Sequence, residues 1–209
     1  MKTRLIGIAG RSGSGKSELA HHLAALLPGK TEVVGLDSYY FALDALPLEE
    51  RGRRNFDHPD SLDWPLIARH ARALSRGEAI EEPEYLFETH TRSAKARLVT
   101  PSQYLILEGL LTFHSEEVRS CLDAGIFVET PDRVCFERRL HRDIVERGRT
   151  VECVARQYSE TVRPMAQQFI DPSARHADLI VRGDAPLEEM LSAARQFLEP
   201  GSHFLSHGA

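Results

Sequence analysis

The sequence predicts an α/β protein in which helices cover both faces of a parallel sheet. Two observations lead to this prediction. Short apolar runs occur at residues 5–9, 32–36, 104–107, 126–128 and 178–181, and segments with helical spacing lie between several of them. Buried strands of a parallel sheet read as continuous apolar runs, and strands that alternate with helices form such a sheet.

The first half of the chain begins with a strand, a glycine-rich turn and a helix. The strand is expected at residues 5–9, and the helix at 17–27, where the Pro-Gly pair at 28–29 ends the helical spacing. After the second strand comes a polar, arginine-rich stretch, residues 37–60, that we expect to be mainly loop with one helical turn. A helix start of the Asp-Trp-Pro type opens an apolar spacing that runs through residues 63–77.

The second half contains an insertion and two further helices. Between residues 80 and 100, Pro83, Tyr85 and Phe87, and then Leu98 and Val99, are typical of short strands around a polar tip, which predicts a small β insertion. A long arginine-rich helix is expected at 132–147. Another is expected at about 150–170, interrupted at Pro164, because proline lacks the amide that a helix interior needs.

Composition indicates one globular domain, residues 1–198, followed by a loose tail at 199–209. Hydrophobic residues make up 42% of the chain and charged residues 27%, and the net charge is −5. This charge argues against a broad nucleic-acid or anionic-membrane surface. No apolar run reaches the ~18 residues of a membrane span, and no signal peptide is recognisable. We expect a cytoplasmic protein and leave open whether it forms a homo-oligomer.

Residues 10–17 read GRSGSGKS, a complete match to the phosphate-binding pattern GxxxxGK[ST]. The match lies between an expected strand and an expected helix, which is the context that the P-loop requires. Its backbone amides and the helix N-terminus attract phosphate, the lysine neutralises charge, and the serine hydroxyl can ligate Mg²⁺. The sequence therefore predicts a P-loop fold that binds ATP or GTP through Gly10, Arg11, Ser12, Gly13, Ser14, Gly15, Lys16 and Ser17.

Two carboxylates follow the ends of expected strands. Glu108 comes at the end of the third strand, where an acid can reach Mg²⁺ together with Ser17. Asp37 follows the second strand, where a carboxylate can take the proton of an acceptor hydroxyl. From position alone, a turn or capping carboxylate remains an alternative for each.

Several classes of nucleotide-binding protein are excluded by the letters. A GTPase needs an NKxD element, but Asn55 is the only asparagine and Phe56 follows it. The sequence lacks the LSGGQ-like segment that is typical of a transporter ATPase. One domain of this size also leaves little room for a motor protein. A kinase that acts on a small molecule remains.

Further segments carry a family resemblance. LDSYY (36–40), NFDHPDSLDW (55–64), PEYLFETHTR (83–92), ILEGLL (106–111), RRLHRDIVERGR (138–149) and TVRPMAQQFIDPSARHADLIV (161–181) occur in this order. In this order they resemble the phosphoribulokinase/uridine kinase family over roughly residues 5–182. The resemblance implies phosphorylation of the 5′-hydroxyl of uridine or cytidine with ATP and Mg²⁺, a step of pyrimidine salvage.

The resemblance also implies roles for individual residues. Asp37 matches the family's general base and Glu108 its Mg²⁺-associated glutamate. On the nucleoside side, the matching positions are Asp57 for the ribose hydroxyls, Tyr85 and His90 for the pyrimidine edge, Phe87 against the base, and Arg149 and Gln157 as further contacts.

The arginine-rich segment allows two interpretations. Charge runs are usually solvated, ion-paired helix faces. Arg139 and Arg142, three residues apart, can instead share one face and close over phosphates as part of a lid at about 138–157. The resemblance favours the lid for Arg139, Arg142 and Arg149, and leaves Arg138 and Arg147 without a role.

The sequence departs from the family pattern at three places. Glu84 and Leu86 differ from the usual residues near the expected base pocket, and residues 181–186 read VRGDAP in place of PRGGxN. One alternative is a kinase of the same group that acts on ribulose 5-phosphate or pantothenate, which the basic run at 51–54 keeps open. The other alternative is a regulator that binds nucleotide without catalysis, but the lysine, the base and the metal acid are all present.

Overall fold

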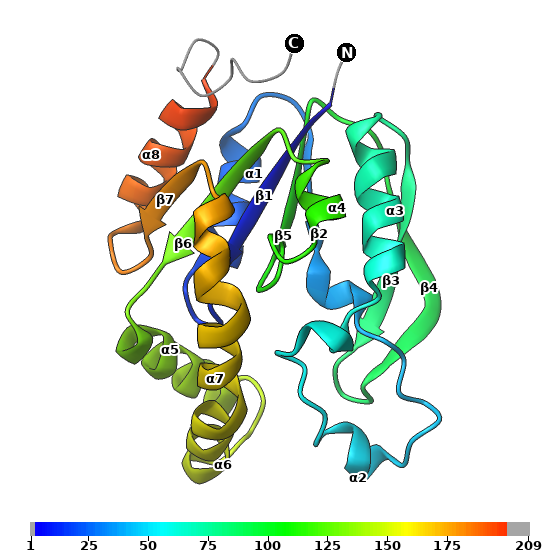
Figure 1. Cartoon of the computed structure of the whole chain (residues 1–209), viewed down its shortest axis with the longest axis vertical. Helices are drawn as coiled ribbons and strands as arrows, with labels where there is room; N and C mark the ends of the chain where they lie inside the picture. Colours follow the sequence, from blue (N-terminus) through cyan, green and yellow to red (C-terminus); the bar gives the residue numbers. More distant parts are fainter. Residues whose placement is uncertain (1–2, 200–209) are drawn as a thin grey trace.

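The computed structural model describes residues 3–199 and contains a five-stranded parallel sheet (Figure 1). Its strand order is β2-β5-β1-β6-β7. The strands are β1 (Arg4–Gly10), β2 (Thr31–Gly35), β5 (Tyr104–Gly109), β6 (Ala124–Glu129) and β7 (Leu179–Arg182). All five overlap the apolar runs of the sequence, so the predicted fold class is confirmed.

Helices cover the sheet on both faces, as the sequence predicts. On one face, α1 (Lys16–Leu26) and α8 (Leu187–Leu198) pack on side chains such as Ile8 and Ile126. On the other face, α3 (Trp64–Ser75) and α4 (Glu116–Arg119) pack on Leu5 and its neighbours. Alternate residues of β1 thus belong to two separate cores.

The register brings the carboxyl ends of the central strands to one edge of the sheet. Gly10 pairs with Val128, Ala9 with Gly109, and Gly35 with Glu108. The loops that follow β1, β2 and β5 therefore start close together. Ligands of open parallel sheets bind at this edge.

The expected insertion is a separate two-stranded antiparallel sheet, β3 (Ile80–Leu86) and β4 (Thr91–Val99). Its base is fixed to the main sheet by Glu82, which is buried. The Glu82 carboxylate accepts hydrogen bonds from the Gly35 amide at 3.1 Å and from Arg97 Nε at 2.7 Å. The polar stretch that precedes α3 is expected to contain one helical turn. It contains three, which are η1 (Leu36–Tyr39), α2 (Leu48–Arg51) and η2 (Pro59–Ser61).

The arginine-rich segment forms α5 (Asp132–Val145), and a second helix starts at α6 (Val151–Gln157). The expected interruption of this second helix at Pro164 is wrong. Helical backbone continues through α7 (Arg163–Met165), with wider π-type turns at residues 158–162 and 166–170 on either side. In an ordinary α-helix, a proline ring clashes with a carbonyl group of the preceding turn. The wider π-type turns make room for the ring, so the helix continues with a different type of turn instead of ending.

The helix α8 ends at Leu198, next to the expected domain boundary. The expected tail lies outside the described residues except for Glu199. Between residues 3 and 199, no helix combines the length and the apolar character that a membrane crossing requires.

Candidate functional site

The loop between β1 and α1 is curled as a phosphate site requires. Gly13 has a φ of 81°, and a Cβ there would lie 2.5 Å from the backbone oxygen of Cys135. Gly15, at the start of α1, has a φ of 95°. Only glycine adopts these conformations without strain, and only glycine allows the contact with α5. The residue pattern and the backbone therefore agree on an anion-binding turn at a helix N-terminus.

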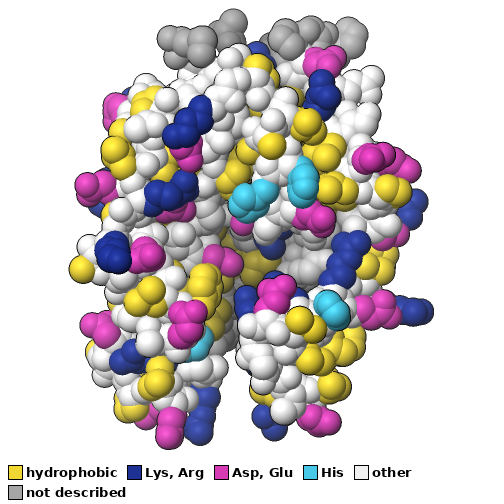
Figure 2. Space-filling model, turned by 180° about the vertical axis from the view of Figure 1, so that it is seen from behind, with side chains coloured by type: hydrophobic (Ala, Val, Ile, Leu, Met, Phe, Trp, Pro, Cys, Tyr) yellow, Lys and Arg dark blue, Asp and Glu magenta, His cyan; other side chains and the backbone are white. Residues whose placement is uncertain are grey.

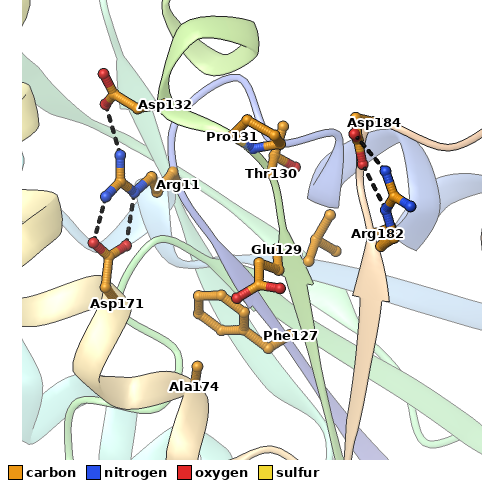
Figure 3. A pocket seen from close by; sticks show the side chains of 11 residues that line it. Arg11, Phe127, Glu129, Thr130, Pro131, Asp132, Asp171, Ala174, Arg182 and Asp184 are labelled. Carbon is orange, nitrogen blue, oxygen red and sulfur yellow. Dashed lines mark hydrogen bonds and ion pairs between the residues drawn. The ribbon is translucent and has the colours of Figure 1, made fainter.

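Arg11 lies in this loop, but its side chain points away from α1 toward two carboxylates (Figure 3). Its guanidinium forms a two-pronged ion pair with Asp171, and its Nη1 lies 2.7 Å from Asp132 Oδ1. Asp132 also accepts from the hydroxyl of Tyr158 and from Arg163. Arg11, Asp132 and Asp171 line one wall of a cavity of about 480 Å³. Only the backbone of Arg11 is left to face a phosphate; its side chain fixes the loop to the first turn of α5.

Ser17 and Glu108 lie together at the carboxyl edge of the sheet. The Ser17 hydroxyl is 3.2 Å from each carboxylate oxygen of Glu108. Burial raises the pKa of Glu108, and Lys16 opposes this rise. A hydroxyl and a carboxylate are hard oxygen donors that suit Mg²⁺, which is commonly held by one or two protein groups together with substrate phosphates. The residues present therefore fit the metal that the resemblance implies.

Asp37 and Asp57 lie in different segments of the chain, but their carboxylates interact electrostatically. Asp37 is exposed, and it accepts a hydrogen bond from the buried hydroxyl of Tyr40 at 3.2 Å. Asp57 is buried. Burial raises its pKa, Arg139 lowers it and Asp37 raises it further. The two carboxylates thus lie within electrostatic range, and one is held by a phenol.

Arg139 and Asp57 approach each other from two sides of a cleft. Arg139 belongs to α5, Asp57 to the segment before η2, and their side chains are 4.0 Å apart. The elements that carry them form the two lobes of the lower half of the molecule, and a cleft separates the lobes on its surface (Figures 1 and 2).

An aromatic cluster lies beside Asp57. Tyr40 packs edge-on against Phe56 and Tyr85, at 5.2 and 5.4 Å between ring centroids, and Phe87 packs edge-on against Tyr85. The ring of His90 stacks on Phe56 at 4.9 Å, and His90 has a left-handed φ of 51°. Burial lowers the pKa of His90, so its ring is neutral at pH 7.

The hydroxyl of Tyr85 is buried without a hydrogen-bond partner among the described residues. Burial raises the pKa of Tyr85 to about 12, which keeps the phenol protonated. A buried hydroxyl is normally paired, because leaving it unpaired costs free energy. An unpaired group next to aromatic rings is the expected state of a binding pocket without its ligand.

The lid residues that the sequence singles out meet at Gln157. The side-chain oxygen of Gln157, Oε1, accepts a hydrogen bond from Arg139 Nη2 at 3.1 Å and another from Arg149 Nη1 at 2.8 Å. Arg139 Nη1 also donates to Ser12 of the phosphate loop at 2.9 Å. Arg142 contacts Asp143 instead. Gln157 therefore holds arginines here, and α5 contacts the phosphate loop directly through Arg139.

The departures from the family pattern differ in their distance from this site. Glu84 points away from the aromatic cluster, because it is exposed and accepts from Ser93, whereas its strand neighbour Tyr85 is buried. The altered loop at 181–186 packs on the phosphate loop, where a Cβ on Gly183 would lie 2.3 Å from the Ser14 oxygen. Arg138, for which the sequence predicts no role, donates from Nη1 to the backbone oxygen of Gly183 at 2.8 Å and so adds a hydrogen bond to this contact.

Three neighbours of the site were not singled out from the sequence: Tyr40, Phe56 and Asp143. Tyr40 lies three residues after Asp37, which places both on one turn of η1 and its end. Asp143 lies four residues after Arg139, a spacing that puts both on one face of a helix. These spacings were available in the sequence, but exposed ion pairs have the same spacings.

The fold and the glycine-rich loop together define a P-loop nucleotide-binding protein. The family model described as "Phosphoribulokinase / Uridine kinase family" matches residues 5–185. Uridine kinases from Shewanella amazonensis and Vibrio cholerae are each 44% identical over 182 residues, which is 85% of this chain and 86% and 85% of theirs. The solved phosphoribulokinase of Rhodobacter spheroides shares the fold, with a TM-score of 0.59 at 17% identity over 89% of this chain and 74% of its own. The chain belongs to the phosphoribulokinase/uridine kinase family.

Proposed function

We propose that this protein transfers the γ-phosphoryl group of ATP to the 5′-hydroxyl of uridine or cytidine and thereby serves pyrimidine salvage. The observation that carries the acceptor assignment is the unpaired, buried hydroxyl of Tyr85, in the aromatic cluster that also contains the neutral ring of His90. Both groups offer hydrogen bonds to the edge of a flat ring in a small pocket. The 44% identity to uridine kinases supports the same acceptor class.

On the acceptor side, the carboxylates have separate tasks. Asp37 takes the proton of the attacking hydroxyl, and the hydrogen bond from Tyr40 fixes the direction of its carboxylate. Asp57 accepts hydrogen bonds from the ribose hydroxyls and keeps the sugar oriented, with Arg139 as its counter-charge. Phe87, Arg149 and Gln157 complete the nucleoside contacts.

On the donor side, the residues neutralise phosphate charge. Lys16 and the loop amides bind the phosphates, and Ser17 and Glu108 hold Mg²⁺. A metal ion held there would supply positive charge against the phosphate charge that develops during transfer. Arg139 and Arg142 stabilise the transferring group from the lid, which is an electrostatic contribution in a site that excludes water.

The rival acceptors are less well supported. A sugar phosphate needs free cations near Asp57, but the Arg51 guanidinium donates to the backbone oxygens of Leu46, Thr89 and Asp44. A regulator without catalysis is disfavoured because Lys16, Asp37 and Glu108 are retained together. We further propose a single domain over residues 1–198 that acts in the cytoplasm on small molecules, without nucleic-acid or membrane partners.

The test is an ATP-coupled assay with a panel of nucleosides, ribulose 5-phosphate and pantothenate. Uridine or cytidine should be phosphorylated with kcat/KM at least ~10²-fold above adenosine, since each unpaired pocket group costs about 1–3 kcal/mol. His90→Ala should raise KM for the pyrimidine nucleoside and leave KM for ATP nearly unchanged. Turnover of ribulose 5-phosphate or pantothenate without any nucleoside would overturn the acceptor assignment and leave the P-loop kinase assignment standing.

A further inference from the structure

Asp143 belongs to α5, and its side chain is completely buried, whereas most other charged side chains of this helix are at least partly exposed to solvent. Four guanidinium groups lie within 4 Å of its carboxylate. Arg142 donates to Oδ1 from Nε at 3.0 Å and from Nη2 at 2.9 Å, and Arg149 donates to Oδ2 at 3.1 Å. Arg147 and Arg139 approach to 3.4 and 3.7 Å. We call these four arginines and Asp143 the lid cluster.

The backbone returns the chain to Asp143 after α5 ends. Gly148 adopts a left-handed φ of 61°, and the amide of Arg149 donates to the backbone oxygen of Asp143 at 3.1 Å. One residue thus fixes Arg149 twice, through its carboxylate and through its backbone oxygen. The turn between α5 and α6 is built around Asp143.

The lid cluster contains more positive than negative charge. Four arginines face one buried carboxylate, and the next acid, Asp57, is within ion-pair distance of Arg139 alone among them, at 4.0 Å. Beyond ion-pair distance, Asp57 also acts on Arg142, and Asp37 acts on Arg147. Burial and the neighbouring Arg142 lower the pKa of Arg147, as expected where cations are crowded. Burial would raise the pKa of Asp143, but the arginines, Arg142 foremost, bring it below its usual range. Asp143 is therefore ionised at neutral pH.

The arginines held by Asp143 reach the two halves of the site. Arg139 donates to Ser12 in the phosphate loop and to Gln157, and Arg149 donates to the same Gln157 oxygen. Asp143 itself touches neither the phosphate loop nor the acceptor side. Whatever it contributes to transfer, it contributes through the arginines.

We propose that Asp143 is the positioning residue of the lid: it assembles the four guanidinium groups before nucleotide binds and leaves an excess of positive charge that the polyphosphate chain of ATP then matches. This proposal rests on the proposed function only in taking ATP as the donor. Preorganised donors stabilise a transition state without rearrangement at the moment of reaction. Asp143 therefore acts on kcat, whereas the net charge of the lid governs ground-state binding of ATP.

The experiment compares Asp143→Asn with Glu137→Gln, which removes an exposed carboxylate from the same helix, where it pairs only with Arg133. Asp143→Asn keeps the shape of the side chain and makes the lid more positive. We expect kcat to fall ~10²-fold, as for loss of a preorganised donor. KM for ATP should stay within about threefold of the parent or fall, and Glu137→Gln should match the parent in both.

Removal of one partner from a buried ion pair strongly destabilises the fold, and Asp143→Asn could lose activity for that reason alone. A second pair of variants, made with Arg147→Gln, therefore separates an effect on stability from an effect on the position of the arginines. Arg147→Gln removes one cation, and adding Asp143→Asn to it restores the original charge balance. We expect the double variant to recover thermal stability relative to Asp143→Asn, while its kcat stays ~10²-fold below that of Arg147→Gln alone. If kcat recovers together with stability, or if Asp143→Asn retains kcat within about threefold, Asp143 is not a positioning residue.

A readout without substrate separates this proposal from the proposed function. Trypsin cleaves after arginine, and in nucleotide-free protein Asp143→Asn should speed cleavage after Arg147 and Arg149 about tenfold relative to Glu137→Gln. Cleavage after Lys30, in the exposed connection between α1 and β2, serves as the reference for a loop that the substitutions do not touch. Equal lid cleavage in the two variants would overturn the proposal. Failure of the wild-type protein to phosphorylate uridine would overturn only the acceptor assignment, and kinetics would then be read on the acceptor that it does use.

Discussion

Tyr85→Phe should change stability and binding in opposite directions. The Tyr85 hydroxyl is buried without a partner among the described residues, so its removal relieves a desolvation cost of about 1–3 kcal/mol in the free protein. For a domain of this size, 1 kcal/mol shifts Tm by roughly 2–4 °C. We therefore expect Tm to rise by at least about 2 °C.

The same change should weaken nucleoside binding. If the hydroxyl finds its partner on the pyrimidine, its loss costs about 1–1.5 kcal/mol, or roughly tenfold in KM for uridine. Kcat should change less, because the proposed partner of the hydroxyl is the pyrimidine and not the transferred group. Thermal denaturation without ligand and steady-state kinetics measure the two effects separately.

Tyr39→Phe is the matched control. Tyr39 is also buried, but its hydroxyl lies 3.0 Å from His70 Nδ1, so its loss breaks a formed hydrogen bond. We expect Tyr39→Phe to lower the free energy of unfolding by about 1 kcal/mol and to leave KM for uridine unchanged. A fall in Tm for Tyr85→Phe similar to that of Tyr39→Phe would refute the argument that the Tyr85 hydroxyl waits for a ligand.

Three further predictions concern the charged residues of the site. Asp37→Asn keeps the size of the side chain but cannot accept the proton, so kcat should fall ~10²–10⁴-fold with nucleoside affinity nearly kept; activity within about threefold of the parent would remove Asp37 from the mechanism. Lys16→Ala should weaken ATP binding and transfer together, while calorimetry without ATP should show nucleoside binding little changed; equal losses at both sites would indicate misfolding instead. For Asp57, burial raises the folded-state pKa, so ionisation disfavours the folded protein, and stability is lost as pH rises from the unfolded-state pKa through the folded-state pKa. Asp57→Asn should therefore have the higher Tm at pH 7, with the difference vanishing below about pH 3, and a Tm difference that does not depend on pH would contradict this sign.

The strands and the phosphate loop were predictable because their signals are local. Each apolar run is continuous and ends at polar or glycine residues, so its boundaries depend on few neighbours. The loop pattern at residues 10–17 specifies a backbone shape, and the backbone has it at Gly13 and Gly15. Pro164 shows the limit of a local rule, because wider turns of the same helix accommodate the ring.

The lid was not predictable to the same depth because burial is a tertiary property. Charges at helical spacing occur on Glu137 and Asp143 alike, but the first is exposed with one arginine partner and the second is buried among four. The return of the chain through Gly148 brings Arg149 to the carboxylate of Asp143, a contact that helical spacing alone does not predict. Likewise, the sequence presents Arg51 as a free cation, whereas its guanidinium is held by backbone oxygens of the loop before α2 and of the β3–β4 turn.

The small sheet β3–β4 has a consequence for how substrate preference can change. It joins the main sheet through Glu82 and Arg97 near its base, and its far end carries Tyr85, Phe87 and His90. The residues for phosphate and proton chemistry lie on the loops of the other sheet. Under the proposed function, recognition of the base is therefore modular: the hairpin tip could be exchanged between homologous kinases, with the anchoring pair kept, and the choice of nucleobase redesigned while the loops of the main sheet stay unchanged.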